Sequence, residues 1–262
     1  MSGGLLLTLF TLAGVAGFGA GFIGLGGGLL LFPLLLYLPP YLGLSAIDAK
    51  TVAALVISQV FFAGLIGGTA HWRKGRVHKR LTIVGAVASA LGAFISGIAS
   101  KWVSDWFLLF LFGVVTLIAG AVMFLPPPSV EREQASAENI VVPSVLLGAI
   151  SFSVGVVVGL LGAGNFLFVP LLIYVLKIPT RITIGSSLAI HVLNGFAGFM
   201  GKMLTGQVPF LMTIVVILGA SLGAIAGEKS HSRVSPRTLR YVYSAVIGVV
   251  ALRIWLTLFD IE

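Results

Sequence analysis

The stretch GFIGLGGGLLLFP, residues Gly21–Pro33, places five glycines within eight residues of an otherwise apolar segment. Glycine is among the poorest helix formers, at ~1 kcal/mol per residue relative to alanine. The cluster therefore predicts a break in a helix that its neighbours would otherwise continue. A similar stretch, GLLGAGNFLFVP, returns at Gly159–Pro170. These two glycine breaks decide which fold the chain is expected to adopt.

The composition is that of a membrane protein. Of the 262 residues, 58% are hydrophobic and 9% are charged, with a mean hydropathy of +1.12, more apolar surface than a water-soluble core needs. The start of the chain lacks a basic region, so no cleaved signal peptide is expected. The absence of cysteine excludes disulfides and thiolate metal sites. The net charge of +8 arises from loops between apolar segments, which favours membrane orientation over nucleic-acid binding.

Apolar segments of about 20 residues, the length that a bilayer core requires, occur six times. Two longer segments, Leu5–Leu38 and Ser144–Leu176, are too long for one helix and too short for two complete spans. Each carries a glycine cluster near its middle, so each is predicted to be a helical hairpin. The six ordinary spans are Thr51–Ala70, Leu81–Ser100, Trp106–Leu125, Ile182–Leu204, Val208–Gly227 and Leu239–Phe259.

The two halves of the chain repeat one another. A polar, proline-rich stretch divides the chain into a first membrane repeat at residues 1–125, a linker at 126–143 and a second membrane repeat at 144–262. Four glycines of the first half recur in the second at one offset of 138, and Leu91-Gly92-Ala93 recurs at an offset of 131. Collinear matches along both halves predict an internal duplication. The glycine matches are Gly17, Gly21, Gly24 and Gly26 with Gly155, Gly159, Gly162 and Gly164.

Basic residues predict that the repeats are inverted. The loop His71–Arg80 contains five Lys and Arg residues and is expected to be cytoplasmic. Its second-half equivalent, Lys202–Val208, has one, and the basic loop there is Glu228–Arg240, one helix later. Equivalent loops then face opposite sides. The expected fold is an all-α membrane protein with an inverted-topology internal repeat, each half a glycine-broken helical hairpin plus three transmembrane helices. Both termini are predicted outside.

The glycine breaks predict an anion site. Irregular backbone at membrane depth is tolerated only where it is buried in protein or lines a wet cavity, and a helix that restarts there directs its N-terminus at whatever fills that cavity. Two inverted hairpins would bring Gly26, Gly27 and Gly28 of the first turn toward Gly164, Asn165 and Phe166 of the second. For Gly17, Gly21, Gly155 and Gly159, close helix packing is the better interpretation.

Few polar residues lie inside the predicted spans, and Asp and Glu are absent from them. The seven candidates for contact with substrate are Ser58, Gln59, Asn165, Ser186, Ser187, His191 and Asn194. His191 either titrates in function or joins two helices in its neutral form, and Gln59 and Asn194 either bind substrate or join helices. Asn165, at a glycine break, is the strongest candidate for a ligand contact. Lys202 and His71 are counterparts near span ends. Lys202 either extends its ammonium to the membrane surface or, with His71, forms a gate or attracts anions.

The stretches GLGGGLLLFPLLL and GLLGAGNFLFVPLLIYVL, the Gly185-Ser186-Ser187-Leu188 element, and the G-x-V elements at Gly75 and Gly206 resemble the TauE/SafE-type sulfite exporter family. The resemblance covers almost the whole chain. It implies a multi-pass permease of the cytoplasmic (inner) membrane for sulfite, sulfonates or related organic anions. GAGNF stands where that family often has more glycine, so Asn165 and Phe166 are expected to tune or change the substrate.

The leading functional hypothesis is a secondary transporter that exports small sulfur-containing anions by alternating access. A small-anion channel and an organic-anion uptake permease remain as alternatives, because each also needs positive dipoles and no carboxylates. A membrane enzyme is disfavoured, since HExxH, GxSxG and paired intramembrane aspartates are all absent. No catalytic residue, cofactor or metal site is expected. The expected partners are a small anion and the lipid bilayer, and a homodimer is compatible with the sequence.

Overall fold

The computed structural model describes residues 3–23, 27–73, 78–123, 143–178, 180–230 and 248–259. Within these ranges the chain is helical and contains no strand, as predicted. Most of the predicted linker 126–143 lies outside the described residues. The long helices are α1 (Gly3–Ile23), α2 (Gly28–Tyr41), α3 (Ala49–Arg73), α4 (Lys79–Ala99), α5 (Asp105–Met123), α6 (Ser144–Leu161), α8 (Thr180–Leu204), α9 (Phe210–Ser230) and a last helix, Gly248–Leu258.

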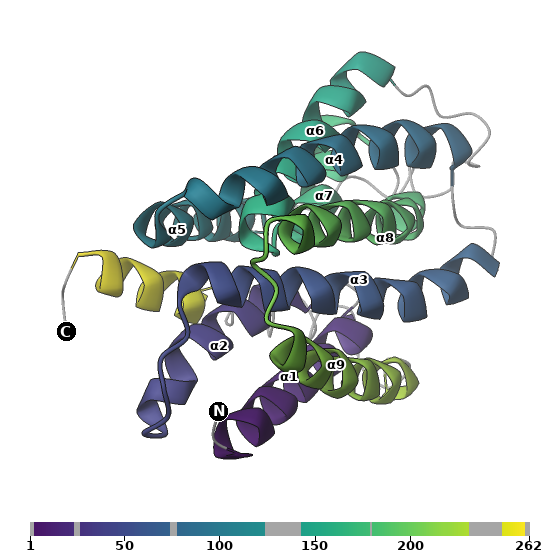
Figure 1. Cartoon of the computed structure of the whole chain (residues 1–262). Coiled ribbons are helices and arrows are strands. Elements are labelled where there is room, and N and C mark those ends of the chain that lie inside the picture. The colour runs from purple at the N-terminus through teal and green to yellow at the C-terminus, as the bar shows by residue number, and fades with distance from the viewer. Residues whose placement is uncertain are drawn as a thin grey trace.

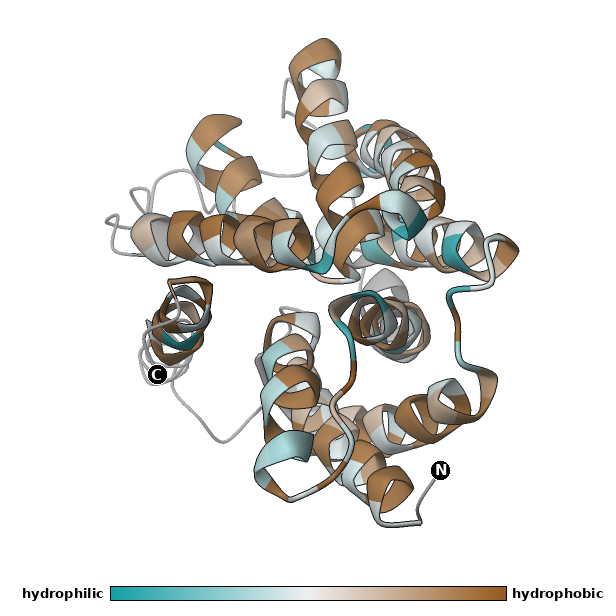
Figure 2. Cartoon of the chain, turned by 60° about the vertical axis from the view of Figure 1, so that its left-hand side comes forward, coloured by the Kyte–Doolittle hydropathy of each residue, from teal (hydrophilic) through white to brown (hydrophobic). Residues whose placement is uncertain are grey.

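Four described helices are long and apolar enough to cross a membrane: Gly3–Gly21, Lys79–Trp102, Ser144–Leu161 and Phe210–Gly227. Hydrophobic residues predominate along the helices (Figure 2). In α4 the outward face is the apolar one, because Ile83, Val87, Leu91 and Ile95 are 52–63% exposed. The opposite face, with Thr82 and Ser89, is buried. This distribution suits a helix whose outer surface meets lipid.

The two glycine-broken segments have unequal arms. In the first, α1 ends at Ile23 and α2 begins at Gly28. In the second, α6 ends at Leu161 and the chain turns through Gly162 (φ 69°) and Gly164 (φ 147°), backbone angles that favour glycine. The expected helix after the second break is irregular. A 3₁₀ turn (η4, Asn165–Leu167) leads into one turn of α-helix (α7, Phe168–Pro170) and then a π-helix (η5, Leu171–Val175).

The helices form two groups, and each group combines helices from both halves of the chain. The fourth helix of the first half, α4, packs mainly on α6 and α8 of the second half. Its second-half counterpart, α9, packs mainly on α1 and α3 of the first. Figure 1 shows α4, α6 and α8 in one group and α1 and α9 in the other, with α3 between them. Contact between α3 and α8 joins the two groups.

Close packing in both groups depends on glycine. Where α1 crosses α9, and where α6 crosses α4, a Cβ on the glycine would clash with the backbone or side chain of the facing helix. This confirms packing as the role of these four glycines. The contacts are Gly17 with Ala220, Gly21 with Ala224, Gly155 with Ser89, and Gly159 with Ala93 and Ser96.

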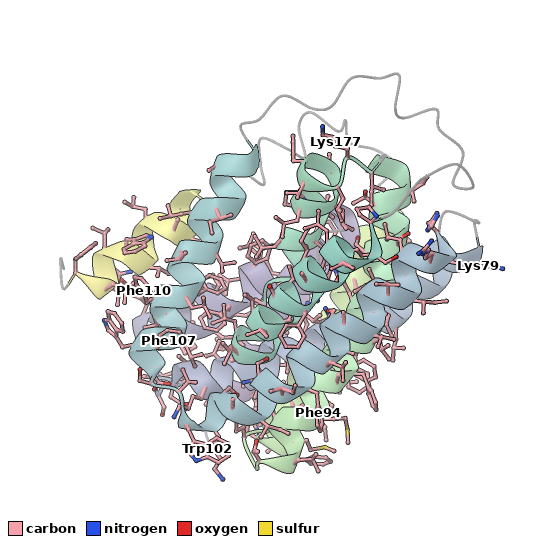
Figure 3. The ribbon with its side chains drawn as sticks, turned by 90° about the horizontal axis from the view of Figure 1, so that it is seen from above. Lys79, Phe94, Trp102, Phe107, Phe110 and Lys177 are labelled. Carbon is pink, nitrogen blue, oxygen red and sulfur yellow. The ribbon has the colours of Figure 1, made fainter. Side chains whose placement is uncertain are left out.

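One end of the molecule carries a row of aromatic residues. The ring centroids of Trp106 and Phe110 on α5 are 5.4 Å apart, and Phe110 lies 5.9 Å from Trp255 on the last helix. Trp102 is 73% exposed at the end of α4 that lies opposite Lys79 (Figure 3). Exposed tryptophans at helix ends are typical of residues at a membrane–water interface.

Candidate functional site

The two glycine turns meet at the centre of the molecule. A Cβ placed on Gly28 would lie 3.2 Å from Ala163 Cβ and 3.0 Å from Val56 Cγ1 of α3. Gly162 lies against the backbone of Ala53 and Ile57 on the same helix. The start of α2 and the second glycine turn are therefore in van der Waals contact with each other and with α3. Gly26 lies outside the described residues.

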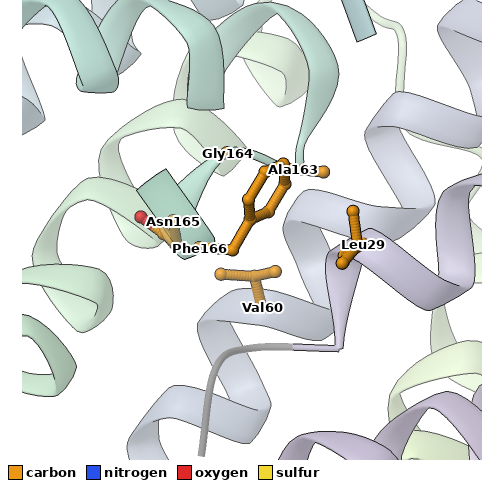
Figure 4. A pocket seen from close by; sticks show the side chains of 7 residues that line it. Leu29, Val60, Ala163, Gly164, Asn165 and Phe166 are labelled. Carbon is orange, nitrogen blue, oxygen red and sulfur yellow. The ribbon is translucent and has the colours of Figure 1, made fainter. Parts of the chain in front are cut away.

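A small cavity of ≈ 10 Å³ lies beside this contact, which is room for about one water molecule. Figure 4 shows the side chains around it. The predicted residues Gly28, Gly164, Asn165 and Phe166 all contribute to its wall. The full lining is Gly28, Leu29, Val60, Ala163, Gly164, Asn165 and Phe166.

Asn165 joins the cavity to α8 and α4. Asn194 Nδ2 donates to Asn165 Oδ1 and to Ser89 Oγ, each at 2.8 Å. His191 hydrogen-bonds to the backbone of Asn165, and its ring centroid lies 5.7 Å from that of Phe168. Asn194 thus has the predicted helix-joining role. All the side chains in this cluster are at most 3% exposed, and those of Asn194, Ser89 and Phe168 are fully buried.

Several buried polar atoms at this centre have no hydrogen-bond partner within the described structure: Asn165 Nδ2, Asn194 Oδ1, His191 Nε2 and both amide atoms of Gln59. An unsatisfied buried polar atom costs about 1–3 kcal/mol, and native proteins contain few. Asn165, one of these four residues, lines the cavity, which indicates a place where a polar ligand or water completes the bonding.

Gln59 of α3 packs against Gly27 of the first turn. Its Nε2 lies so close to Gly27 that a Cβ on that glycine would clash with it. The neighbouring Ser58 differs, because its hydroxyl donates to Ala54 O of its own helix at 2.7 Å. Gln59, rather than Ser58, is therefore the α3 side chain with atoms left over for a ligand.

The remaining predicted residues lie away from the cavity. Ser186 Oγ accepts from the backbone N–H of His78 at 3.1 Å, at the start of α4. It precedes Asn194 by eight residues, about 12 Å along a helix. Ser187 is buried on α8 at 2% exposure. His71 is part of α3, but its side chain lies outside what the structure describes.

Lys202 does not extend to the surface, so that expectation was wrong. The residue is 0% exposed. Its Nζ donates to Ser100 Oγ at 2.7 Å and to Leu160 O, near the end of α6, at 3.2 Å. A cation at a helix C-terminus is stabilised by the helix dipole. The two hydrogen bonds and the helix dipole together hold this group where α4, α6 and α8 meet, about 12 Å along α8 from Asn194.

Sequence reasoning missed the polar residues that α4 and α6 bring to this group. On α4 and its C-cap they are Thr82, Ser89, Ser96 and Ser100, and on α6 Ser151, all buried. The α4 positions are spaced by 7, 7 and 4 residues, which places them on one helix face. That periodicity within the predicted span Leu81–Ser100 was the signal that could have found them.

Apolar helices long enough to cross a membrane around a buried polar centre define the class as a multi-pass membrane protein. The chain belongs to the family described as Sulfite exporter TauE/SafE, whose model matches residues 9–254. It is similar to a probable membrane transporter protein of Xylella fastidiosa, 28% identical over 92% of this chain and 90% of that one. Similar proteins occur in Methanocaldococcus jannaschii (23% identical, 95% of each chain) and Bacillus subtilis (22% identical, 95% and 96%), each also named a probable membrane transporter protein. No solved structure matches the chain.

Proposed function

We propose that this protein is a secondary transporter that exports small sulfur-containing anions, such as sulfite or organosulfonates, across the cytoplasmic membrane. The observation that carries the proposal is the meeting of two glycine turns beside unpartnered amide donors. Asn165 Nδ2 and Gln59 Nε2 are buried N–H groups without acceptors. Oxyanions offer acceptors in several directions. The family description names sulfite exporters, and it is the source of the sulfur-anion class.

The two halves are inverted repeats in this proposal. The support comes from pairs of contacts between helices. Applying the two sequence offsets to both residues of one contact gives the residues of another contact. Gly17 against Ala220 becomes Gly155 against Ser89 when 138 is added to the α1 residue and 131 subtracted from the α9 residue. The same operation relates Gly21 with Ala224 to Gly159 with Ala93, and Gly14 with Gly223 to Phe152 with Gly92. One packing arrangement occurring twice in opposite chain order is what a pseudo-two-fold axis produces.

Alternating access accounts for the size of the cavity. A sulfite ion, with a sulfur and three oxygens, needs several times the ≈ 10 Å³ of this cavity. The described conformation is therefore an occluded one in this mechanism, and the turns separate to admit the anion. A membrane potential that is negative inside drives an anion outward at about 2.3 kcal/mol per charge per 100 mV. His191, with Nε2 free, is the group available for proton coupling.

Efflux from proteoliposomes tests the proposal. Purified protein is reconstituted with internal sulfite or sulfoacetate, an outside-positive potential is imposed, and external anion is followed over time. Saturable efflux that depends on the potential and on anion identity is expected. Efflux equal to that of protein-free liposomes would refute the function, and unitary currents in a planar bilayer would favour a channel.

A further inference from the structure

We propose that the transported anion follows the interface between α4 and α8 rather than the equivalent interface between α9 and α3. This inference rests on the proposed transport of small anions. We define the α4–α8 seam as Thr82 and Ser89 of α4, Ser100 at its C-cap, Ser186, Asn194 and Lys202 of α8, and Ser151 of α6.

Hydrogen bonds join the seam at three levels. The backbone N–H of His78 donates to Ser186 Oγ near the start of α4, Asn194 Nδ2 donates to Ser89 Oγ in the middle, and Lys202 Nζ donates to Ser100 Oγ at the end. The residue numbers rise together on both helices, so α4 and α8 run in the same direction. The polar contacts therefore extend along nearly the whole length of the two helices.

Parts of the seam have bonding capacity that the described structure leaves unused. Thr82 Oγ1 and Ser151 Oγ have no hydrogen-bond partner within the described structure. Both residues are buried, at no more than 8% exposure. Ser151 Oγ lies opposite Gly85 of α4, between the levels of Thr82 and Ser89, since a Cβ on Gly85 would be 3.4 Å away. Ser100 differs, because its hydroxyl donates to Gly97 O of its own helix turn at 2.7 Å, an ordinary local bond for serine.

The charge of the seam suits an anion. Its side chains are hydroxyls, one amide and the ammonium of Lys202, and none is a carboxylate. At the Lys202 end, Lys50 Nζ donates to Lys101 O, the residue next to Ser100. Two ammonium groups therefore bind adjacent residues at the end of α4. An anion that leaves the Asn165 cavity meets hydroxyl groups first and positive charge last.

Among the residues that the structure describes, the equivalent interface has fewer polar groups. By the two offsets of the repeat, Ser89 corresponds to Ala220 and Ser151 to Ala13. Thr213, equivalent to Thr82, is a polar residue that both interfaces keep, and its hydroxyl is also unpartnered within the described structure. Two similar helix interfaces thus differ in polarity, and an anion requires the polar one.

Thiol accessibility tests the route, because the chain has no cysteine of its own. Ser89→Cys and the matched Ala220→Cys place a thiol at equivalent positions, each packed on a glycine of the neighbouring helix. The reagent is 2-sulfonatoethyl methanethiosulfonate, a small sulfonate, and the protecting anion is sulfoacetate, since sulfite would cleave the product. Lys101→Cys, at an exposed position, shows that reagent and protein are active.

We expect Ser89→Cys to react at least 10-fold faster than Ala220→Cys and to be slowed by sulfoacetate, with Thr82→Cys behaving as Ser89→Cys does. Equal rates at positions 89 and 220, or no reaction at 82 and 89 while Lys101→Cys reacts, would overturn the route. Efflux by the unmodified protein separates the two proposals. If the unmodified protein transports sulfoacetate while the seam thiols do not react, only the route is wrong. If it transports no anion, the proposed function is wrong.

Discussion

Asn194 donates one amide hydrogen to Asn165 Oδ1 at 2.8 Å and thereby fixes the side chain of the second glycine turn. Its other amide hydrogen goes to Ser89 Oγ. The pair orients Asn165 with its Nδ2 free of partners, beside a cavity lined by both halves of the chain. A donor that is held in place, buried and unpartnered is a preformed contact for an anion, and binding to it needs little reorganisation.

Asn165→Asp is expected to lower anion efflux at least 100-fold. The substitution keeps the shape and the bond from Asn194, but replaces the free donor with a carboxylate oxygen. Two like charges 4 Å apart repel by about 4 kcal/mol at an effective dielectric constant of 20. Initial efflux rates in proteoliposomes measure the effect.

The control for this variant is Ser104→Asp, which adds the same charge at an exposed position where Ser104 Oγ caps α5 through Phe107 N. Aspartate is a good N-cap, so efflux is expected to stay within twofold of the unmodified protein. Equal efflux from Asn165→Asp and Ser104→Asp would contradict an anion site at Asn165.

Gly17→Ala and Gly155→Ala are expected to destabilise the protein by similar amounts, about 1–3 kcal/mol each. In both variants the new methyl group meets backbone atoms of the facing helix, Ala220 in one case and Ser89 in the other. The thermal midpoint in detergent measures the loss. Gly148→Ala, on α6 with open space around it, is expected to unfold no lower than the unmodified protein. A large loss for one of the two glycines and none for the other would argue against equivalent packing in the two halves.

Lys202→Met is expected to lower efflux at least 10-fold and to change unfolding by no more than about 1 kcal/mol. The variant loses hydrogen bonds to Ser100 Oγ and Leu160 O, which costs stability, but it also removes a buried charge, which offsets that cost. Efflux and thermal midpoint are measured on the same preparation.

Lys101→Met is the matched control for Lys202→Met, because it removes the same charge from an exposed neighbour of Ser100. Salt screens the interaction between an exposed charge and an anion inside the protein. We therefore expect efflux to change less than twofold. Should both variants lose efflux alike, net surface charge rather than the buried ammonium would be responsible.

The predicted orientation can be measured with single cysteines. Lys79 and Lys177 are exposed and are expected on the cytoplasmic side, while Lys101, beside Trp102 at the opposite end of α4 from Lys79 (Figure 3), is expected outside. A membrane-impermeant maleimide should label Lys101→Cys in intact cells, and Lys79→Cys and Lys177→Cys only after permeabilisation. Labelling of Lys79→Cys in intact cells would reverse the topology.

Much of the fold could be predicted from the sequence, because its signals are local. The length of each apolar segment predicts a helix of similar length. The predicted span Leu81–Ser100, for example, corresponds to α4 at Lys79–Ala99. Glycine clusters set the breaks, so the second turn falls at Gly162–Gly164 as expected. The pairing of α4 with α6 and α8 depends on contacts between distant segments, and no local pattern specifies them.

The site was only partly predictable, for the same reason. Asn165 stood out because an amide at a glycine break is unusual, whereas Ser89 did not, because isolated serines are common in membrane helices. The location of Lys202 was misjudged because its sequence position near a span end is equally compatible with a surface lysine. Its Nζ bonds to Ser100 Oγ and Leu160 O, and these two residues belong to other segments that are distant in the sequence.

The most direct test of the central claim is a structure determined with sulfite or sulfoacetate bound. The account predicts density for one anion between the two glycine turns, within hydrogen-bond distance of Asn165 Nδ2 and Gln59 Nε2, with Gly28 and Ala163 farther apart than their present contact. An anion bound elsewhere in a protein that still transports it, with the two turns closed and Asn165 Nδ2 unoccupied, would contradict it.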